Sequence, residues 1–462
     1  MGGPVRPVAD AFILFGASGD LAHKKLLPAL YELTKEGRLE LPVIGVANTD
    51  WTDADMQQRA RESVNLHYGG NTDLDALDRL CQRLSYLAGD YADADTWVQL
   101  EKMTEDAKVP VCFLAIPPAF FDTVVRGMSG IGLAQQSRVV VEKPFGRDLA
   151  SAKELNYTLH EFLDETQIYR IDHFLGKEPV QNLMVFRFAN SLMEAVWNRN
   201  HIDSITVTMA EAFGVEGRGR FYDEVGTIRD VVQNHLLQMI ALLTMEPPAS
   251  RNQHAFLDEK VKVFRAMAPL DPANVVRGQV EGYQDEPGVA PGSTTETFAA
   301  MKIEIDSWRW SGVPFYIRAG KSLAANVTEA VVAFKEPPRM LFSEEGHQPD
   351  PCRLRFRMKP DDNITLTMQA KVPGLEMVSR AVDMTVDYEQ QLGGQVSDAY
   401  VRLIADALVG DKRLFARQDG VEQAWRIVDP ILGGNEPVLP YKPGTWGPEE
   451  AKRFVPKGSG PI

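Results

Sequence analysis

The N-terminal stretch constrains the fold most, because it carries a strand, a tight turn, a helix and a second strand in close succession. Ala11–Phe15 is a short apolar run ending at Gly16, which is typical of a parallel strand buried on both faces. Leucines at helical spacing follow and end near Gly37, and residues 42–47 predict the second strand. A unit of this kind predicts the right-handed crossover of a parallel sheet.

The turn after the first strand lies where a dinucleotide-binding fold places its phosphate loop. It consists of Gly16, Ala17, Ser18, Gly19, Asp20 and Leu21. Glycines at its first and fourth positions, and the small Ala22 at the seventh, permit a tight turn and close approach of a pyrophosphate to a helix N-terminus. Ser18 stands where a second glycine is usual, so a plain strand-to-helix turn is the alternative interpretation.

The segment that closes the second strand bears on the choice of cofactor. In dinucleotide folds an acidic residue here favours the free ribose hydroxyl of NAD, whereas an arginine accommodates the phosphate of NADP. Residues 47–50 contain Asn48 and Asp50 and no arginine. We therefore expect a nicotinamide cofactor, NAD or NADP, with NAD used at least as well as NADP.

Alternating strands and helices continue to about residue 172. Residues 109–116, 137–142 and 168–171 predict further strands, and residues 148–163 predict a helix. We expect residues 1–172 to form a Rossmann-like α/β dinucleotide-binding domain, in keeping with the usual size of a domain.

Residues 173–462 have a different texture, with longer strands in which apolar and polar residues alternate. This pattern predicts a larger α+β domain with a mostly antiparallel sheet, one face of which is covered. The expected strands include residues 205–209, 301–305, 353–357 and 364–368; helices are expected at 227–243 and 398–408, and a surface loop at 282–295.

Charge and composition exclude several kinds of partner and location. The net charge of −15 argues against nucleic acid, so an anionic ligand must be held by a local basic cluster. Cys81, Cys112 and Cys352 show neither disulfide nor metal spacing, which fits a reducing cytoplasm. The N-terminus lacks a secretory apolar region, and no run of ~20 apolar residues could span a membrane. We expect a cytoplasmic protein.

Residues 170–178, Arg-Ile-Asp-His-Phe-Leu-Gly-Lys-Glu, hold the densest group of reactive side chains. Asp172 could orient a histidine base, while His173 and Lys177 could donate charge-assisted hydrogen bonds to a phosphate. For an isolated Asp-His pair, a solvated turn would be the simpler interpretation.

Other candidates lie at predicted strand ends and on one helix. Lys143 follows a strand within Glu-Lys-Pro and could contact nicotinamide and substrate, with Pro144 in the cis form. Asp230 and Asn234 lie four apart on the helix that also carries His235, which by itself could be an ordinary core histidine. Glu211 and Lys321 also end strands, where surface charge is the alternative.

Together these segments resemble the glucose-6-phosphate dehydrogenase family. The matching segments are residues 16–31, 142–147, 170–178, 217–238 and 313–321. The resemblance implies a dinucleotide-binding domain followed by a β+α domain whose sheet forms the interface of a homodimer or homotetramer. It also implies hydride transfer from C1 of glucose 6-phosphate to NAD or NADP, giving 6-phosphoglucono-1,5-lactone, the first step of the pentose phosphate pathway.

The resemblance also implies a role for each candidate residue. His235 matches the general base and Asp172 the carboxylate that orients it; His173 and Lys177 match the phosphate ligands. Lys143 matches the lysine that positions sugar and cofactor. Glu211, Asp230 and Lys321 match polar groups around the sugar, and no metal is expected.

Two positions depart from the family pattern. Phe174 replaces a tyrosine of the phosphate pocket, and Asn326 replaces a second basic residue. Because a lost hydrogen bond to a charged group costs ~1.5–3 kcal/mol, we expect a high KM that falls when tyrosine and lysine are restored. Two alternatives stay open: a dehydrogenase of another sugar or sugar phosphate, and a sugar-phosphate-binding regulatory relative with little turnover.

Overall fold

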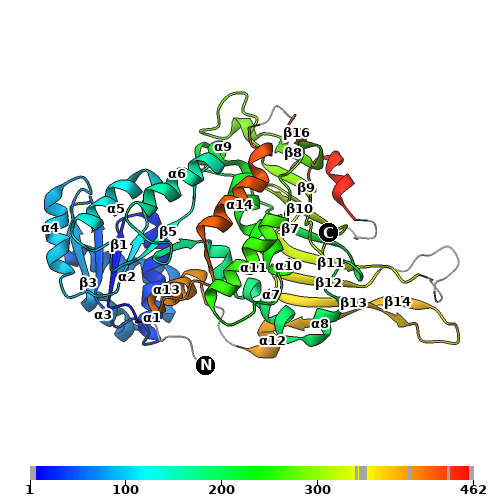
Figure 1. The fold of residues 1–462 in the computed structure, drawn as a ribbon, viewed down its shortest axis with the longest axis horizontal. Helices are drawn as coiled ribbons and strands as arrows, with labels where there is room; N and C mark the ends of the chain where they lie inside the picture. The colour runs from blue at the N-terminus through cyan, green and yellow to red at the C-terminus, as the bar shows by residue number, and fades with distance from the viewer. Residues whose placement is uncertain (1–6, 339–341, 343–350, 394–396, 434–436, 457–462) are drawn as a thin grey trace. The chain divides into compact units, whose positions relative to one another are not determined.

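The computed structural model describes residues 7–338, 342, 351–393, 397–433 and 437–456. Residues 1–6, on which part of the expectation about the N-terminus rests, lie outside this description. The chain forms two compact units, each built from more than one stretch of sequence (Figure 1). The first unit comprises Met1–Glu178, Pro248–Asp258 and Val396–Glu422, and the second comprises Pro179–Pro247, Glu259–Gln395 and Gln423–Ile462.

The first unit contains a seven-stranded sheet of dinucleotide-binding topology. Six parallel strands run in the order β3-β2-β1-β4-β5-β6, and β15 joins β6 antiparallel at the edge. This order places the topological switch point, where such folds bind their ligands, between β1 and β4. The strands are β1 Ala11–Phe15, β2 Val43–Ala47, β3 Leu84–Ala88, β4 Pro110–Leu114, β5 Arg138–Glu142, β6 Ile168–Ile171 and β15 Phe415–Ala416.

Helices cover both faces of this sheet. Ile13 and Phe15 of β1 share a core with α4, α5 and α6, while α1 packs against α2, α3 and α13 (Figure 1). The five residues of β1 are all buried, as the apolar run predicts. The helices are η1 Ala22–Leu26, α1 Leu27–Lys35, α2 Asp53–Tyr68, α3 Leu74–Arg83, α4 Ala94–Met103, α5 Phe121–Gly130, α6 Leu149–His160 and α13 Ala399–Val409.

The second unit contains a nine-stranded sheet in the order β14-β13-β12-β11-β7-β10-β9-β8-β16. Only β7–β10 and β8–β16 pair in parallel among the strands that the structure describes, so the sheet is mostly antiparallel, as predicted. The strands are β7 Ile202–Ala210, β8 Val275–Val280, β9 Phe298–Glu304, β10 Pro314–Gly320, β11 Val327–Phe334, β12 Arg353–Lys359, β13 Asn363–Lys371, β14 Ser379–Asp387 and β16 Leu439–Tyr441.

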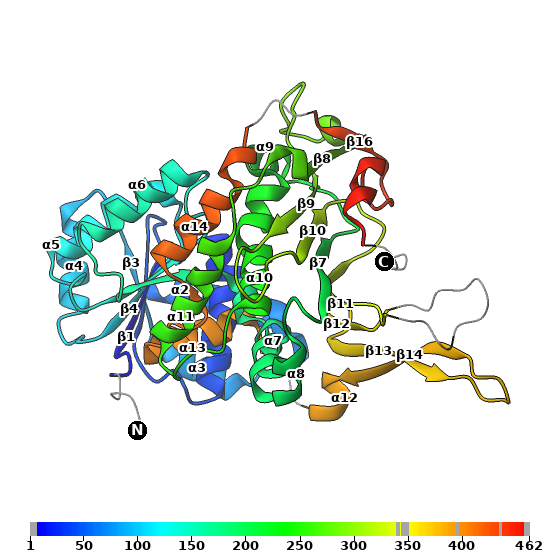
Figure 2. The ribbon, with the colours of Figure 1, turned by 45° about the vertical axis from the view of Figure 1, so that its right-hand side comes forward.

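Helices of the second unit gather along one face of this sheet (Figure 2). Phe186 and Trp197 pack edge-on against Phe356 of β12, with ring centroids 5.1 and 6.3 Å away. The helix expected at 227–243 is present, but its first half is a π-helix, η5. The helices that lie wholly or partly in this unit are α7 Glu178–Ala189, α8 Ser191–Val196, α9 Gly219–Thr227, η5 Ile228–Leu236, α10 Leu237–Thr244, α11 Gln253–Ala266, α12 Tyr388–Leu392 and α14 Gln418–Val428; α11 and α14 begin within the first unit.

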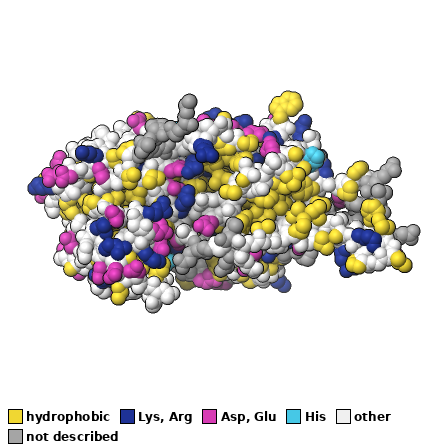
Figure 3. Space-filling view, turned by 90° about the horizontal axis from the view of Figure 1, so that it is seen from below, with side chains coloured by type: hydrophobic (Ala, Val, Ile, Leu, Met, Phe, Trp, Pro, Cys, Tyr) yellow, Lys and Arg dark blue, Asp and Glu magenta, His cyan; other side chains and the backbone are white. Residues whose placement is uncertain are grey.

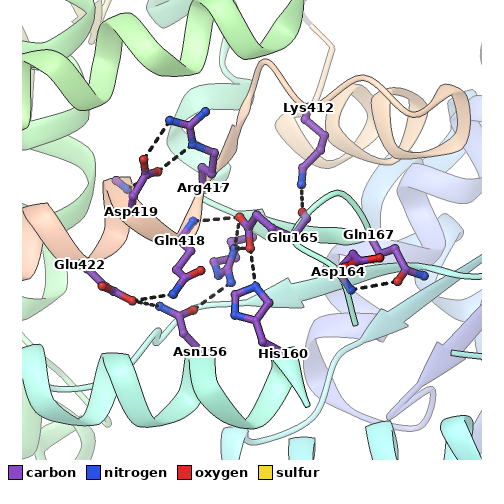
Figure 4. Close-up of polar contacts among 12 residues, drawn as sticks. Asn156, His160, Asp164, Glu165, Gln167, Lys412, Arg417, Gln418, Asp419 and Glu422 are labelled. Carbon is purple, nitrogen blue, oxygen red and sulfur yellow. Dashed lines mark hydrogen bonds and ion pairs between the residues drawn. The ribbon is translucent and has the colours of Figure 1, made fainter. Parts of the chain in front are cut away.

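A buried polar network explains why a late segment of the chain belongs to the first unit (Figure 4). The fully buried Arg170 donates to Glu165 at 2.7 Å and to Asn156 at 2.8 Å. The backbone N–H of Gln418 donates to Glu165, and Asn156 donates to Glu422. These bonds fasten the C-terminal segment to β6, directly before Asp172.

Within the described residues, no helix combines the length and the apolar character that crossing a membrane requires. The three cysteines are free thiols, and Cys81 and Cys112 are buried.

Candidate active site

The phosphate loop begins at a position that only glycine can occupy. Gly16 has φ +79°, and an added Cβ would lie 2.3 Å from the carbonyl oxygen of Ala115. Its N–H donates to the hydroxyl of Tyr91 at 2.9 Å, and that hydroxyl donates to Val46 O at 3.1 Å. Tyr91, which the sequence did not single out, thus ties the loop to the end of β2.

The rest of the loop fits a pyrophosphate. Ala17 is buried, whereas Gly19 and Asp20 are exposed before the first turn of η1. The hydroxyl of Thr49 donates to Ser18 Oγ at 2.8 Å, which fixes the loop against the segment that follows β2. Small side chains and a backbone exposed at a helix start suit a dinucleotide phosphate.

Asn48 and Asp50 lie on the surface at the end of β2, where the adenosine ribose of a dinucleotide would be read. Both side chains are exposed. Asn48 and Asp50 therefore lie at the strand end predicted from the sequence. The preference between NAD and NADP depends on the charge and hydrogen-bonding groups of these two side chains.

Lys143 and Asp172 are brought together by strand register. Glu142 of β5 pairs with Ile171 of β6, so the next residue of each strand emerges at the same edge of the parallel sheet. The Lys143–Pro144 peptide bond is cis, as the sequence suggested.

The 170–178 motif turns sharply after β6 into the short helix η4, His173–Gly176. Asp172 is buried, and its Oδ1 accepts from the N–H of Phe174 at 3.0 Å. The Phe174 ring is 1% exposed, and Lys177 Nζ lies 5.3 Å from its centroid. The Phe174 ring therefore packs against Lys177 and makes a cation–π contact with its ammonium group.

Tyr400 of α13 also belongs to this site, although it lies far along the chain. Its ring is parallel to that of His173, with centroids 6.4 Å apart, and its hydroxyl hydrogen-bonds to Glu142. An added Cβ on Gly176 would lie 2.8 Å from Ala399 O, so this glycine permits the close packing of η4 on α13. No local signal in the sequence links Tyr400 to the motif.

In the second unit, register likewise joins Glu211 and Lys321. Ala210 of β7 pairs with Gly320 of β10, and the two following side chains form an ion pair. Lys321 is 5% exposed, and its Nζ lies 5.2 Å from the ring of Phe213 and 5.6 Å from that of Tyr222. Lys321 is therefore a fixed, largely desolvated cation rather than surface charge.

Asp230 and His235 lie on the π-helix η5. A π-helix bonds residue i to i+5, so these two side chains, five apart, lie nearer one another around the axis than in an α-helix. Asn234 instead turns its amide back to Arg229 O at 3.0 Å. Asp230 and Asn234, four residues apart, stay on one side of the helix in a π-helix as they would in an α-helix. His235 is 4% exposed.

Asn326 has a structural contact in this unit. Its Oδ1 accepts from the N–H of Ala212 at 2.7 Å, next to Glu211. This hydrogen bond fixes the turn after β7.

The first unit is a doubly wound sheet with a glycine-containing phosphate loop. The second unit presents an acid, a lysine and a histidine. Together these features define a dinucleotide-dependent oxidoreductase. Sequence comparison gives the family. The profile "Glucose-6-phosphate dehydrogenase, NAD binding domain" matches residues 13–182, and "Glucose-6-phosphate dehydrogenase, C-terminal domain" matches residues 184–459. The chain belongs to the glucose-6-phosphate dehydrogenase family.

Individual relatives agree over almost the whole chain. Glucose-6-phosphate 1-dehydrogenase 1 of Mycobacterium bovis is 45% identical over 97% of this chain and 95% of its own length. The crystal structure of the Mycobacterium avium glucose-6-phosphate 1-dehydrogenase has a TM-score of 0.88 at 44% identity, covering 97% of both chains. A glucose-6-phosphate dehydrogenase solved with glucose 6-phosphate has a TM-score of 0.93 at 34% identity and covers 100% of both.

A more distant similarity concerns the fold alone. A levoglucosan dehydrogenase structure covers 90% of this chain and 94% of its own, with a TM-score of 0.51 at 11% identity.

Proposed function

We propose that this protein oxidises glucose 6-phosphate at C1 and transfers the hydride to a nicotinamide dinucleotide, releasing 6-phosphoglucono-1,5-lactone. The observation that carries the proposal is the 170–178 motif, folded at the end of β6 beside Lys143 in a dinucleotide-binding sheet. Glucose-6-phosphate dehydrogenases that match this chain over nearly their whole length support the same reaction.

His235 acts as the general base in this proposal. It takes the proton of the C1 hydroxyl while the C1 hydride leaves, and Asp172 orients it and stabilises the imidazolium that forms. The bound nicotinamide supplies the hydride acceptor. The protein contributes one base and the positions of the reacting groups.

The substrate is held by charge at its phosphate and by hydrogen bonds around its ring. His173 and Lys177 bind the phosphate, and the Phe174 ring supports Lys177 from below. Lys143 positions sugar and cofactor. Glu211, Asp230 and Lys321 bind the sugar hydroxyls; the ion pair of Glu211 with Lys321 keeps both groups in place before substrate arrives.

The phosphate loop, Gly16 to Leu21, holds the dinucleotide. With Asn48 and Asp50 exposed after β2, we propose that NAD serves at least as well as NADP. The free thiols support a cytoplasmic location.

The second unit also offers a surface for a second copy of the chain. Strand β14 lies at the edge of the nine-stranded sheet and exposes Val382, Met384 and Val386 by 44%, 52% and 42%. Hydrophobic side chains gather on the right-hand half of the face in Figure 3. An exposed apolar edge strand favours association, so we propose a homodimer, or a homotetramer built from it. Sedimentation of the wild type and of Met384→Glu tests this.

One assay tests the reaction. Reduced nicotinamide is followed by absorbance with glucose 6-phosphate, other hexose phosphates and unphosphorylated glucose, each with NAD and NADP. We expect glucose 6-phosphate to give the highest kcat/KM and His235→Ala to lose at least ~100-fold in kcat. His254→Ala, which removes an exposed imidazole, is the control.

The same assay separates the alternatives. Faster turnover of another sugar phosphate would assign a different dehydrogenase. Binding of glucose 6-phosphate without turnover, measured by calorimetry, would indicate a regulatory relative.

A further inference from the structure

A buried carboxylate, Glu296, holds the start of the helix that carries Asp230 and His235. Its Oε1 accepts from the N–H of Ile228, the first residue of η5, at 3.0 Å. Its main-chain oxygen accepts from the N–H and the hydroxyl of Thr227 at 3.0 and 3.2 Å. One residue, itself 3% exposed, thus satisfies three donors where the helix begins.

The second carboxylate oxygen is fixed by Arg277. Its Nη2 donates to Glu296 Oε2 at 2.8 Å, and both side chains are largely buried. One carboxylate oxygen of Glu296 therefore accepts a hydrogen bond from the first N–H of η5, and the other accepts one from the guanidinium of Arg277. Gly226 makes room for this arrangement: it has φ +68°, and an added Cβ would lie 2.6 Å from Oε1.

The next residue, Thr297, holds the other half of the sugar site. Its carbonyl oxygen accepts from the N–H of Lys321 at 2.9 Å. Its hydroxyl lies 2.9 Å from that of Tyr441, which donates to Lys321 O at 2.7 Å. Consecutive residues thus anchor the helix of His235 and the strand end of Lys321.

Tyr222 provides a second connection between the start of η5 and Lys321. The hydroxyl of Tyr222 lies 2.8 Å from that of Thr227, and Lys321 Nζ lies over the Tyr222 ring. A shift at the start of η5 would reach the lysine through Tyr222 as well as through the Glu296–Thr297 backbone.

We propose that Glu296, held by Arg277, is a positioning residue that fixes the helix of Asp230 and His235 relative to Lys321, an inference that rests on the function proposed above. It touches neither proton nor hydride. It acts by setting where the base and the sugar ligands stand, and an error of about 1 Å in such positions costs about 100-fold in rate.

Kinetics of Glu296→Ala test the proposal. We expect kcat for glucose 6-phosphate to fall at least about 10-fold, with a displaced acid limb of the pH–kcat profile, because His235 changes surroundings. KM should rise by a smaller factor than kcat falls, because His173 and Lys177, which bind the phosphate, do not depend on Glu296. The double variant Glu296→Gln with Arg277→Met retains an acceptor for Ile228 without a buried unpaired charge, and should keep kcat within about threefold of wild type.

Glu329→Ala is the matched control. Glu329 is 5% exposed and pairs with Arg357 between β11 and β12, so its loss removes a comparable carboxylate. Assays are run well below the unfolding temperature of each variant. If Glu329→Ala lowers kcat and moves the acid limb as much as Glu296→Ala does, or if Glu296→Ala leaves both unchanged, positioning is overturned while the proposed reaction stands.

Hydrogen exchange gives a readout independent of turnover. The amides of residues 228–236 should exchange at least about 10-fold faster in Glu296→Ala than in wild type or Glu329→Ala. A wild-type protein without activity would refute the proposed function. If the amides of residues 228–236 then exchanged at the same rate in Glu296→Ala as in wild type, the positioning role would be refuted as well.

Discussion

The hydroxyl of Tyr400 hydrogen-bonds to the carboxyl group of Glu142, while its ring lies parallel to the imidazole of His173. These contacts join α13 to the end of β5 and to η4 within the first unit. Because Glu142 directly precedes Lys143, Tyr400 links the imidazole of His173 to the strand end that carries Lys143. The carboxyl group at this junction has consequences that can be measured.

Stability should depend on pH through Glu142. Burial raises its pKa from 4.5 to about 7, so between these values the folded protein keeps a proton that the unfolded chain has released. Stability therefore falls as pH rises through this interval. Glu142→Gln removes the effect, and we expect the variant to gain ~1–3 kcal/mol relative to wild type between pH 5 and pH 8.

Urea unfolding at several pH values measures this gain. Glu105→Gln, at an exposed glutamate, is the control and should show no such trend. A difference between Glu142→Gln and wild type that stays constant with pH would refute a raised pKa.

Cofactor preference should respond to Asn48. A guanidinium at this exposed position could bind the 2′-phosphate of NADP in a bidentate manner, whereas the asparagine carries no charge. We expect Asn48→Arg to raise the ratio of kcat/KM for NADP to that for NAD by about 10-fold or more. Asn65→Arg places the same charge on an exposed site of α2 and should leave the ratio unchanged. A wild-type preference for NADP of about 100-fold would contradict our expectation for the unaltered chain.

Local patterns predict the elements that carry the site but not all of their partners. The apolar run of Ala11–Phe15 and the turn at Gly16 suffice for the phosphate loop, because both depend on neighbouring residues. The π-helix η5 was expected as an ordinary helix, since its apolar pattern does not record its hydrogen bonds. The register that joins Glu211 to Lys321 is a long-range property of the sheet.

Tyr400 illustrates the largest gap. Its helix was expected, but its unit was not, because residues 396–422 return to the first unit through contacts with distant residues. Arg138 donates to Ala407 O and Leu408 O, and Glu165 accepts from Gln418. Such bonds leave no periodic trace in the sequence, so a site residue that depends on them escapes prediction.

The ion pair that fastens this segment should contribute to stability. Burial alone raises the pKa of Glu165, but the charge and hydrogen bonds of Arg170 outweigh it and hold the pKa below its ordinary value. The contribution is therefore full above the ordinary value of 4.5 and is lost as pH falls through the lower, folded-state value.

Glu165→Gln should accordingly destabilise the protein by ~1–3 kcal/mol at neutral pH, and less as pH falls below 4.5. Urea unfolding with Glu161→Gln, at a glutamate that the network does not include, measures the difference. Equal effects of the two substitutions at neutral pH would rule out a special role for the pair.

The KM for glucose 6-phosphate should depend on Phe174 more than on Asn326. Tyrosine at 174 keeps the ring beneath Lys177 and adds a hydroxyl that can bind the phosphate, worth ~1.5–3 kcal/mol. Asn326→Lys adds a charge but gives up the hydrogen bond to Ala212 N beside Glu211. We expect Phe174→Tyr to lower KM about 10-fold and Asn326→Lys to lower it less.

Steady-state kinetics of Phe174→Tyr, Asn326→Lys and the double variant separate the effects of the two substitutions on KM. Phe162→Tyr is the matched control, because Arg126 lies 5.0 Å from the Phe162 centroid in the same kind of cation–π contact. A lower KM in this control would attribute the effect to ring chemistry in general. A wild-type KM already in the micromolar range would show that the missing hydroxyl is compensated, because the Lys177 ammonium and the His173 imidazole would then bind the phosphate without it.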